Sequence, residues 1–324
     1  MMNLGKDLNE NKLLESYPEV LDILLYDNTT KKNIIWGTNN YESHGTGYSE
    51  NDHILVEQIT GRHNGIIKPR VEKSKKEQQK RSKDMAEVFT PSWVCNKQNN
   101  LVDEKWFGYE NSFNIEHEKI WIVTPKVKFT SEKTWKDYIN DVRLEITCGE
   151  APYLVSRYDS VTGEFLSIEK RIGLLDRKLR VVNENANNEE WYDFVVLAFK
   201  SIYGFDYQGD NVLLARENLL FTFIDYYQNK FIEFPDREKL IEIAKIISWN
   251  IWQMDGLKMV VPNSCRIHKT IQYNLFGEEI ATGEICIGCQ KNDINKHNGI
   301  YCEIMDWGKN KKVKFVELFK GGAR

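Results

Sequence analysis

Cysteine and histidine residues near the carboxyl terminus have the spacing of a metal site. Cys286 and Cys289 form a CxxC pair with a glycine between them, a turn in which backbone amides can face a thiolate-bound metal. His297 follows Cys289 by eight residues, and Cys265 lies upstream across an insert of hairpin length. Zinc takes four nitrogen or sulfur ligands in a tetrahedral arrangement. We therefore predict a zinc site formed by Cys265, Cys286, Cys289 and His297.

Two further residues of this segment compete for the four ligand positions. His268 lies three residues after Cys265, and Cys302 lies five residues after His297. Cys302 falls in the alternating segment 300–304, which is typical of a strand, so it also fits a buried core position. Four of the six cysteines fall in the last sixty residues, and in a reducing compartment such clustering indicates metal before disulfides. Buried free thiols beside a surface histidine are the alternative.

A basic run lies between Lys68 and Lys83. It has eight Lys and Arg against two Glu, a local charge of +6, in a stretch rich in Gln and Lys that favours a helix. One interpretation is the solvated face of a helix. The other is a surface that contacts nucleic-acid phosphates, and it assigns phosphate contacts to Lys73, Lys75 and Lys76.

The chain as a whole is not basic. It has 44 Lys and Arg against 48 Asp and Glu among 324 residues, a net charge of −4, with 41% hydrophobic residues. These values are typical of a soluble globular protein of about two domains. No run approaches the length of a membrane span, and the first residues lack the apolar region of a secretory signal. We expect a cytoplasmic protein without a membrane segment.

The middle of the chain alternates between strand-like and helix-like segments. Residues 143–154 read as a strand, a small-residue turn and the start of a helix, and residues 205–206 read as the end of a second strand. Apolar periodicity predicts helices over 189–202, 211–227 and 237–251. This alternation is the α/β pattern that produces a parallel sheet.

Three short motifs lie in order within this region. They are Phe89-Thr90-Pro91, the segment 145–151 (Glu-Ile-Thr-Cys-Gly-Glu-Ala) and Gly204-Phe205-Asp206. They resemble the Phe/Tyr-Thr-Pro motif, the Asp-Pro-x-Cys-Gly-Ser-Gly loop and the Gly-x-Asp/Glu strand end of the adenine-specific (N6) DNA methyltransferases of restriction-modification systems, especially their modification subunits. The resemblance covers residues 68–227. It implies an α/β fold with a Rossmann-like core that binds S-adenosylmethionine.

The resemblance also implies a role for each motif residue. Asp206 would accept hydrogen bonds from the ribose hydroxyls, Glu145 would attract the methionine ammonium, and Gly149 would let the backbone approach the ligand. Two positions depart from the family pattern: Glu-Ile replaces Asp-Pro at 145–146, and Ala151 replaces the final glycine. The full set of implied cofactor-binding residues is Phe89, Thr90, Pro91, Glu145, Thr147, Cys148, Gly149 and Asp206.

The base-binding motif of this family is missing. Adenine N6-methyltransferases flip the base out and hold its amino group with an Asn/Asp-Pro-Pro-Tyr/Phe motif, whereas this chain contains no Pro-Pro pair. We therefore expect an incomplete methyltransferase core without catalytic residues of its own. The predicted organisation is an N-terminal region with a basic helix (1–84), an S-adenosylmethionine-binding domain (85–262), and a zinc-binding element with a C-terminal strand (263–324).

Three functions are compatible with these features. The first is the S-adenosylmethionine-binding subunit of a split DNA adenine methyltransferase for restriction-modification or phage defence, with the Asn-Pro-Pro-Tyr motif and target recognition on a partner chain. The second is a non-catalytic methyltransferase-fold zinc protein that binds nucleic acid or acts as a scaffold. The third is a nuclease, because Asp159 with Asp176-Arg177-Lys178 resembles the pattern of an acid followed by Asp/Glu-x-Lys in metal-dependent hydrolases. Residues 176–180 fit a salt-bridged helix better.

Overall fold

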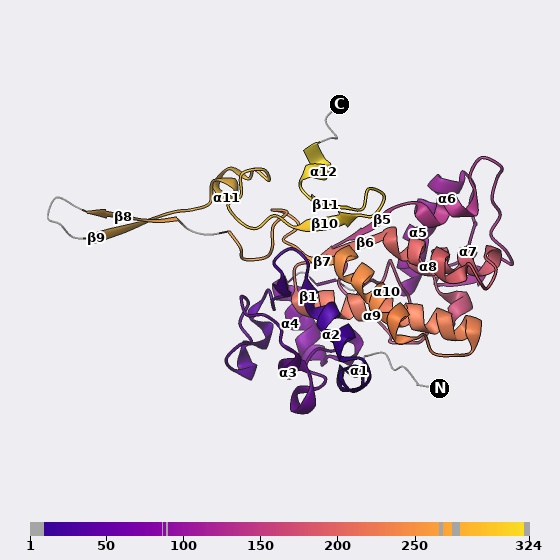
Figure 1. Ribbon diagram of the computed structural model, residues 1–324, viewed down its shortest axis with the longest axis horizontal. Helices are drawn as coiled ribbons and strands as arrows, with labels where there is room; N and C mark the ends of the chain where they lie inside the picture. The colour runs from indigo at the N-terminus through magenta and orange to yellow at the C-terminus, as the bar shows by residue number, and fades with distance from the viewer. Residues whose placement is uncertain (1–9, 86, 89, 266–267, 274–278, 321–324) are drawn as a thin grey trace.

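A three-stranded parallel sheet lies inside the computed structural model, which describes residues 10–85, 87–88, 90–265, 268–273 and 279–320 (Figure 1). Its strands are β5 (Arg143–Ile146), β6 (Ile202–Asp206) and β7 (Ile251–Gln253), in the order β5-β6-β7. All three run parallel, with Ile146 opposite Phe205 and Asp206 opposite Gln253. The parallel sheet predicted from the sequence is present, in a mixed helix and sheet architecture.

Two helix pairs connect the three strands. The helices α7 (Leu174–Asn185) and α8 (Trp191–Lys200) lie between β5 and β6, and α9 (Gly209–Phe231) and α10 (Arg237–Asn250) lie between β6 and β7. Arg216 of α9 is fully buried and donates to the backbone carbonyls of Leu24, Tyr26, Ser248 and Ile251. Carbonyls at helix ends lack partners within the helix, so this one guanidinium joins α9 to the ends of two neighbouring helices.

The helix predicted directly after the turn at residue 151 does not form. Thr147, Gly149 and Ala151 all have positive φ values, of 48°, 53° and 63°, so the turn extends to residue 151 and no right-handed helix can begin before residue 152. The chain instead passes through turns and the short η4 (Ile168–Lys170) before α7 begins. The helices predicted over 189–202, 211–227 and 237–251 are present as α8, α9 and α10, with ends that differ by up to four residues. In the basic stretch 68–83, the α-helix begins only at Lys75.

The N-terminal region packs on the helices rather than forming a separate core. The helix α2 (Pro18–Leu25) lies against α10, and its apolar residues share one hydrophobic core with α7, α8, α9 and α10. Residues on both sides of position 84 therefore bury apolar surface together. The remaining elements of this region are α1 (Glu10–Ser16), β1 (Tyr26–Asp27), β2 (Lys32–Asn33), η1 (Asn39–His44), α3 (Val56–Ile59), η2 (Gly61–His63), η3 (Arg70–Glu72) and α4 (Lys75–Met85).

A helix and a small hairpin precede β5. They are α5 (Ser92–Phe107), β3 (Asn114–His117) and β4 (Ile120–Val123), followed by α6 (Trp135–Asn140). Asp103 of α5 forms a buried ion pair with Arg177 of α7, 2.6 Å apart, and it also accepts a hydrogen bond from the hydroxyl of Tyr138 in α6. This polar network fixes α5 against α6 and α7.

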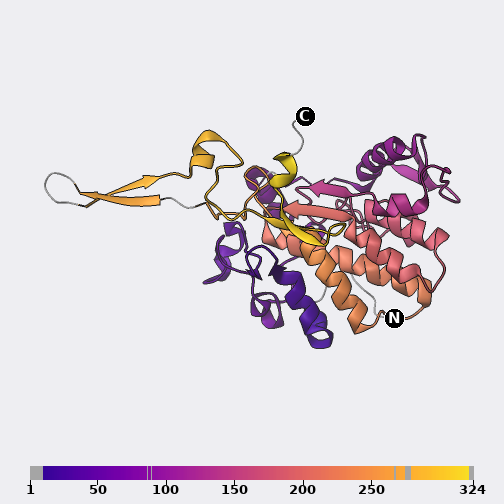
Figure 2. The same ribbon diagram turned by 45° about the horizontal axis from the view of Figure 1, so that its top comes forward.

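The C-terminal segment covers the other face of the sheet. The hairpin of β10 (Glu303–Asp306) and β11 (Lys311–Lys314), followed by α12 (Glu317–Lys320), packs over β6 and β7. Tyr203, Phe205 and Trp252 of the sheet form a second hydrophobic cluster with residues of this hairpin, including Ile304 and Phe315. The sheet therefore lies between helices on one face and a hairpin on the other (Figure 2).

A two-stranded ribbon projects away from the body. It consists of β8 (His268–Tyr273) and β9 (Glu279–Glu284), paired antiparallel, and α11 (Ile287–Lys291) lies at its base (Figures 1 and 2). Within the part of the chain that the structure describes, no helix is both long enough and apolar enough to cross a membrane.

Candidate functional site

A cavity of about 560 Å³ opens at the carboxyl ends of β5 and β6, and we call it the strand-end cavity. In parallel sheets the crevice at this edge is the usual place for a ligand. The lining residues are Thr38, Met85, Glu87, Val88, Thr90, Glu145, Ile146, Thr147, Cys148, Gly149, Glu150, Pro152, Tyr153, Asp206, Tyr207, Gln208 and Asn211. The fold therefore brings described residues of all three sequence motifs to one cavity.

Six of the eight predicted cofactor residues line this cavity. They are Thr90, Glu145, Thr147, Cys148, Gly149 and Asp206. Pro91, which directly precedes α5, is not among the lining residues. Phe89 lies outside the described residues.

Asp206 is the end residue of β6 and is buried. Its Oδ2 accepts the Gly149 amide at 2.9 Å, and its Oδ1 accepts the Gln208 amide at 3.0 Å and the Asn211 side chain at 3.4 Å. Burial raises the pKa of this carboxyl above its ordinary value. A carboxylate offers about four lone-pair sites. Oδ2 accepts one hydrogen bond, so one of its lone pairs remains for a ligand hydroxyl. Oδ1 accepts two hydrogen bonds, and a second ligand hydroxyl could replace the longer one, from Asn211.

Glu145 is a second buried carboxyl, on the strand next to Asp206. Its oxygens accept the amides of Tyr153 at 3.4 Å and Leu154 at 3.2 Å. Burial raises the pKa of Glu145 well above its ordinary value, and the charge of Asp206 adds to this rise. Neither Glu145 nor Asp206 belongs to an ion pair among the described residues.

The turn between these two acids holds its shape through left-handed residues. Gly149 has φ +53° and open space where a Cβ would lie, so glycine is needed for its backbone conformation rather than for room. Cys148 packs its sulfur against Gly204 of β6, where a Cβ would approach within 3.4 Å of that sulfur. Ala151 is fully buried in the hydrophobic core and does not line the cavity. The alanine at position 151, where the family pattern has glycine, therefore does not narrow the cavity.

The cavity is acidic. Glu87, Glu145, Glu150 and Asp206 line it, and none of the described lining residues is Lys, Arg or His. Glu87 is neutralised by Arg81 at 2.7 Å, and Glu150 accepts a hydrogen bond from the hydroxyl of Tyr158. Burial raises the pKa of Glu150 as well. Because burial penalises carboxylates without cationic partners, this cavity favours a ligand with positive charge.

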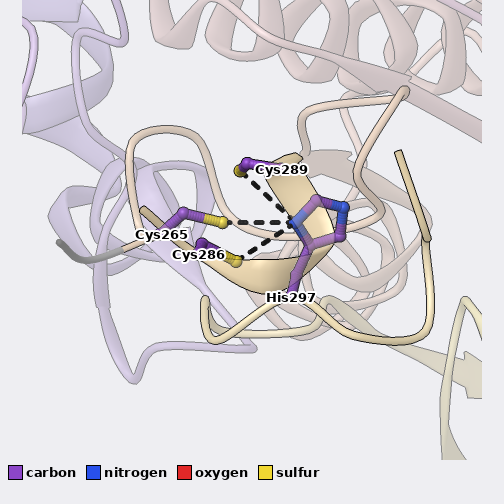
Figure 3. A group of neighbouring side chains, drawn as sticks. All are labelled: Cys265, Cys286, Cys289 and His297. Atoms are coloured by element: carbon purple, nitrogen blue, oxygen red, sulfur yellow. Dashed lines mark hydrogen bonds between the residues drawn. The ribbon is translucent and has the colours of Figure 1, made fainter. Parts of the chain in front are cut away.

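The second candidate site is the Cys3His cluster, formed by Cys265, Cys286, Cys289 and His297. Their ligand atoms all lie within 4.8 Å of one another, and each of the three sulfurs lies 3.6 Å from Nδ1 of His297 (Figure 3). With Zn–S bonds of about 2.3 Å and Zn–N bonds of about 2.0–2.1 Å, a tetrahedral ion holds each sulfur about 3.6 Å from the nitrogen. These four residues could hold zinc.

Short-range geometry assembles this cluster. Cys286 precedes α11 and Cys289 lies within it, while the amide of Asn298 donates to the sulfur of Cys286 at 3.2 Å. A Cβ at Gly288 would lie 2.6 Å from the amide nitrogen of His297 and 2.7 Å from its Nδ1. Only glycine allows this approach, which explains the glycine inside the CxxC pair.

The cluster thiols differ in acidity. Burial opposes ionisation of Cys286, but hydrogen bonds from the amides of Asn298 and Cys289 and from the His297 side chain prevail and lower its pKa to about 6. Burial, followed by interactions with Cys289 and Cys286, raises the pKa of Cys265 to about 12. The negative charge of one thiolate thus opposes ionisation of the neighbouring thiols, and a bound cation removes this repulsion.

Cys302 and His268 were the two other candidates for the metal-ligand positions. Cys302 is buried in the second hydrophobic cluster, and its sulfur lies 3.4 Å from the carbonyl of Gln253, away from the four-residue cluster. The side chain of His268 lies outside the described part of the structure.

The basic run divides into two faces. Lys73 and Arg81 are buried and face Asp210, at 3.6 Å and 2.7 Å. The prediction that Lys73 contacts phosphates is therefore wrong, because its charge is used inside the protein. Exposed positions are occupied by Lys68, Lys75, Lys76, Lys80 and Lys83.

The residues of the predicted nuclease pattern do not converge on one site. Asp159 accepts the amide of Ser92 at the start of α5, and Asp176 accepts the amides of Ser156 and Gly173 at the start of α7. Lys178 is fully buried and donates to the carbonyl of Ile139 at 3.0 Å and to the hydroxyl of Ser201 at 2.7 Å. These contacts are structural.

Sequence reasoning did not predict the other eleven lining residues of the cavity as cofactor residues, and four of them show why. Glu150 directly follows the predicted glycine turn, and Tyr207 directly follows Asp206, so adjacency to the motifs was a usable signal for both. Glu87 and Asn211 enter the cavity from α4's end and from α9, and only the fold shows this.

Comparisons of the chain with models of known protein families, with curated proteins and with solved structures found no match.

Proposed function

We propose that the chain is the S-adenosylmethionine-binding subunit of a split DNA adenine N6-methyltransferase in a restriction-modification or phage-defence system. The observation that supports this most strongly is the convergence of three separated motifs on the strand-end cavity. Thr90, the turn 145–149 and Asp206 come from distant parts of the chain, and all line the same cavity. A cavity of about 560 Å³ is within the usual range for small-molecule and cofactor sites.

The charge of the cavity supports this ligand over a dinucleotide. S-adenosylmethionine has a sulfonium and an ammonium group, both cationic, whereas dinucleotides bring a pyrophosphate. The carboxyls of Glu145 and Asp206, which have no cationic partner among the described residues, suit the first kind of ligand, because its positive charge favours their ionised form. The described lining offers no Lys, Arg or His for a pyrophosphate. In this proposal Asp206 accepts the ribose hydroxyls, Glu145 attracts the ammonium, and the backbone at Gly149 lies against the methionine part.

Two features support an enzyme whose base-binding residues lie on a partner chain: the residues that line the cavity and the exposed edge of the sheet. Adenine N6 needs acceptor groups and a stacking ring, and the described cavity residues include no Asn/Asp-Pro-Pro sequence. Among the described strands, β5 pairs only with β6, and its residues Leu144 and Ile146 are 42% and 65% exposed. A partner chain that approaches this edge would bring its own residues beside the cavity.

Calorimetric titration with S-adenosylmethionine tests the cofactor assignment. Loss of a hydrogen bond to a charged group costs roughly 1.5–3 kcal/mol, so Asp206→Ala should weaken binding about tenfold to a hundredfold. Asp193→Ala, which removes an exposed acid of α8, is the matched control and should bind normally. Undiminished binding by the Asp206 variant would remove this residue from the site.

Methyl transfer tests the division of labour. The purified chain should not methylate DNA, and activity should appear when a partner that contains an Asn-Pro-Pro-Tyr motif is added. Transfer by the chain alone would contradict the split enzyme.

The second candidate function is a non-catalytic zinc protein that binds nucleic acid. It is favoured by the contacts of Asp206, whose oxygens already accept three hydrogen bonds within the protein. In that case S-adenosylmethionine would not bind, while zinc and nucleic acid would.

A further inference from the structure

A polar groove of about 580 Å³ runs along α4. It is lined by Arg70, Lys75, Gln78, Gln79, Ser82 and Lys83. Three of these side chains are cationic, and no described lining residue is acidic or apolar. The strand-end cavity has the opposite character, because its charged lining residues are all acids.

Buried contacts hold α4 firmly in place. Arg81, one turn from the groove residues, donates to Glu87 at 2.7 Å and faces Asp210 at 2.7 Å. The side chain of Gln78 donates to the carbonyls of Arg70 and Lys73, both at 2.9 Å, and so joins the helix to η3 before it. The exposed lysines are therefore presented from a fixed element rather than from a loose surface helix.

Residues that line the groove and residues that line the strand-end cavity are neighbours along the chain. Lys83 lines the groove, and Met85, two residues further on, lines the cavity together with Glu87 and Val88. Val88 is 83% exposed. A polyanion bound in the groove would thus lie close to residues that line a cavity without described Lys, Arg or His residues.

We infer that the exposed face of α4 binds the phosphate backbone of duplex DNA and holds it beside the strand-end cavity. Lys75 and Lys83 are eight residues apart on one helix, about 12 Å along its axis at 1.5 Å per residue. Measured along the duplex axis, where the phosphates of one strand recur about every 3.4 Å, this length corresponds to three to four phosphates. The side chain of Gln79 adds hydrogen-bond donors for phosphate oxygens, whereas the donors of Gln78 and Ser82 already bond to backbone carbonyls of the protein. The inference adds the DNA-binding surface to the proposed function and rests on it for the role of the cavity.

Fluorescence anisotropy with a labelled duplex, in the absence of S-adenosylmethionine, tests the surface. The variant replaces Lys75, Lys76, Lys80 and Lys83 together by Gln. The control replaces four exposed lysines elsewhere, Lys105, Lys126, Lys128 and Lys136, also by Gln. We expect the α4 variant to bind duplex DNA at least tenfold more weakly, with the slope of log affinity against log salt reduced by up to about 3.6, whereas the control changes little.

Three results would overturn the inference. They are equal binding by the α4 variant and the intact chain, an equal loss in the control variant, and tighter binding of single-stranded RNA or an acidic peptide than of duplex DNA. All four replaced side chains are exposed, and an unchanged thermal melt shows that the variant folds. S-adenosylmethionine titration of the same variant separates the two hypotheses, because the cofactor affinity should not change when DNA binding is lost.

Discussion

The strand-end cavity and the Cys3His cluster are built in opposite ways. The cluster takes its four ligands from one short segment, in which Cys265 and His297 are 32 residues apart. The cavity takes its lining from Thr38 through Asn211, on strands, turns and helix starts that the hydrophobic core holds together. Local geometry and one ion are sufficient for the first site, whereas the second needs the whole fold.

The charges in the two sites are also stabilised differently. The carboxyls of Asp206 and Glu145 accept backbone amides that the fold supplies. Apart from the amide contacts of Cys286, the thiols of the cluster mainly face one another and His297. The cluster should therefore depend on its metal, and the cavity should not.

Removal of the metal should produce the largest effect. Structural zinc sites contribute about 10–16 kcal/mol of apparent binding energy, and Cys286→Ser or Cys289→Ser should release zinc and loosen residues 262–302. Hydrogen exchange should rise there, while α9 and the rest of the large core keep their protection. Elemental analysis should find one zinc in the intact chain and none in these variants.

Cys302→Ala is the control for this prediction. Its sulfur lies in the second hydrophobic cluster, so this variant should lose stability but keep one zinc per chain. Absence of zinc from protein purified without chelator would contradict the metal assignment.

The Cys3His cluster and the turn of the strand-end cavity each contain a glycine, and each needs it for a different reason. Gly288→Ala places a methyl against the backbone and ring of His297, so zinc affinity should fall at least tenfold. Gly149→Ala meets no atom within 4 Å and is disfavoured only by its φ of +53°. A left-handed alanine costs roughly 1–2 kcal/mol. Chelator competition measures the first effect and denaturant unfolding the second, and an equal loss of zinc affinity in both variants would refute the distinction.

The same contrast explains how far sequence reasoning could go. The Cys3His cluster was predictable because ligand spacing in one segment limits the geometry, and α8, α9 and α10 were predictable from strong apolar periodicity. The predicted helix after residue 151 is wrong, because the chain passes through turns there and the next α-helix, α7, begins only at Leu174. Lys73 and Arg81 could not be distinguished from their exposed neighbours, since composition does not show which lysine or arginine faces Asp210.

The stability of the protein should depend on pH through the buried carboxyls of the strand-end cavity. Burial raises the pKa of Glu145 and of Asp206, so the folded protein keeps these carboxyls protonated at pH values where the unfolded chain has lost the protons. Their contribution to stability is thus present below the ordinary carboxyl pKa and is lost as pH rises through the folded-state value.

A cationic ligand should reverse this effect, because it stabilises the carboxylates and lowers their pKa. Binding of S-adenosylmethionine should release protons, and affinity should rise with pH from the ordinary carboxyl range up to the raised value of the free protein. Calorimetry in buffers of different ionisation enthalpy counts the released protons. Glu145→Gln should release fewer protons, and the same count in this variant and in the intact chain would exclude Glu145 from the ligand's surroundings.

The smallest expected effect concerns communication between the two sites. Tyr207 lines the strand-end cavity, and its hydroxyl donates to Asn263 at 2.8 Å, two residues before Cys265 of the cluster. A neutral hydrogen bond contributes about 0.5–1.5 kcal/mol, so metal binding should change cofactor affinity through this contact by about two- to tenfold. Tyr207→Phe keeps the ring in the cavity and removes the hydroxyl. In this variant the cofactor affinities of zinc-loaded and zinc-free protein should become closer, whereas Tyr153→Phe, which alters another cavity tyrosine, should leave the difference as it is. If zinc changes the affinity equally in the intact chain and in Tyr207→Phe, the cavity and the cluster are joined by another route; if zinc changes it in neither, the two sites are independent.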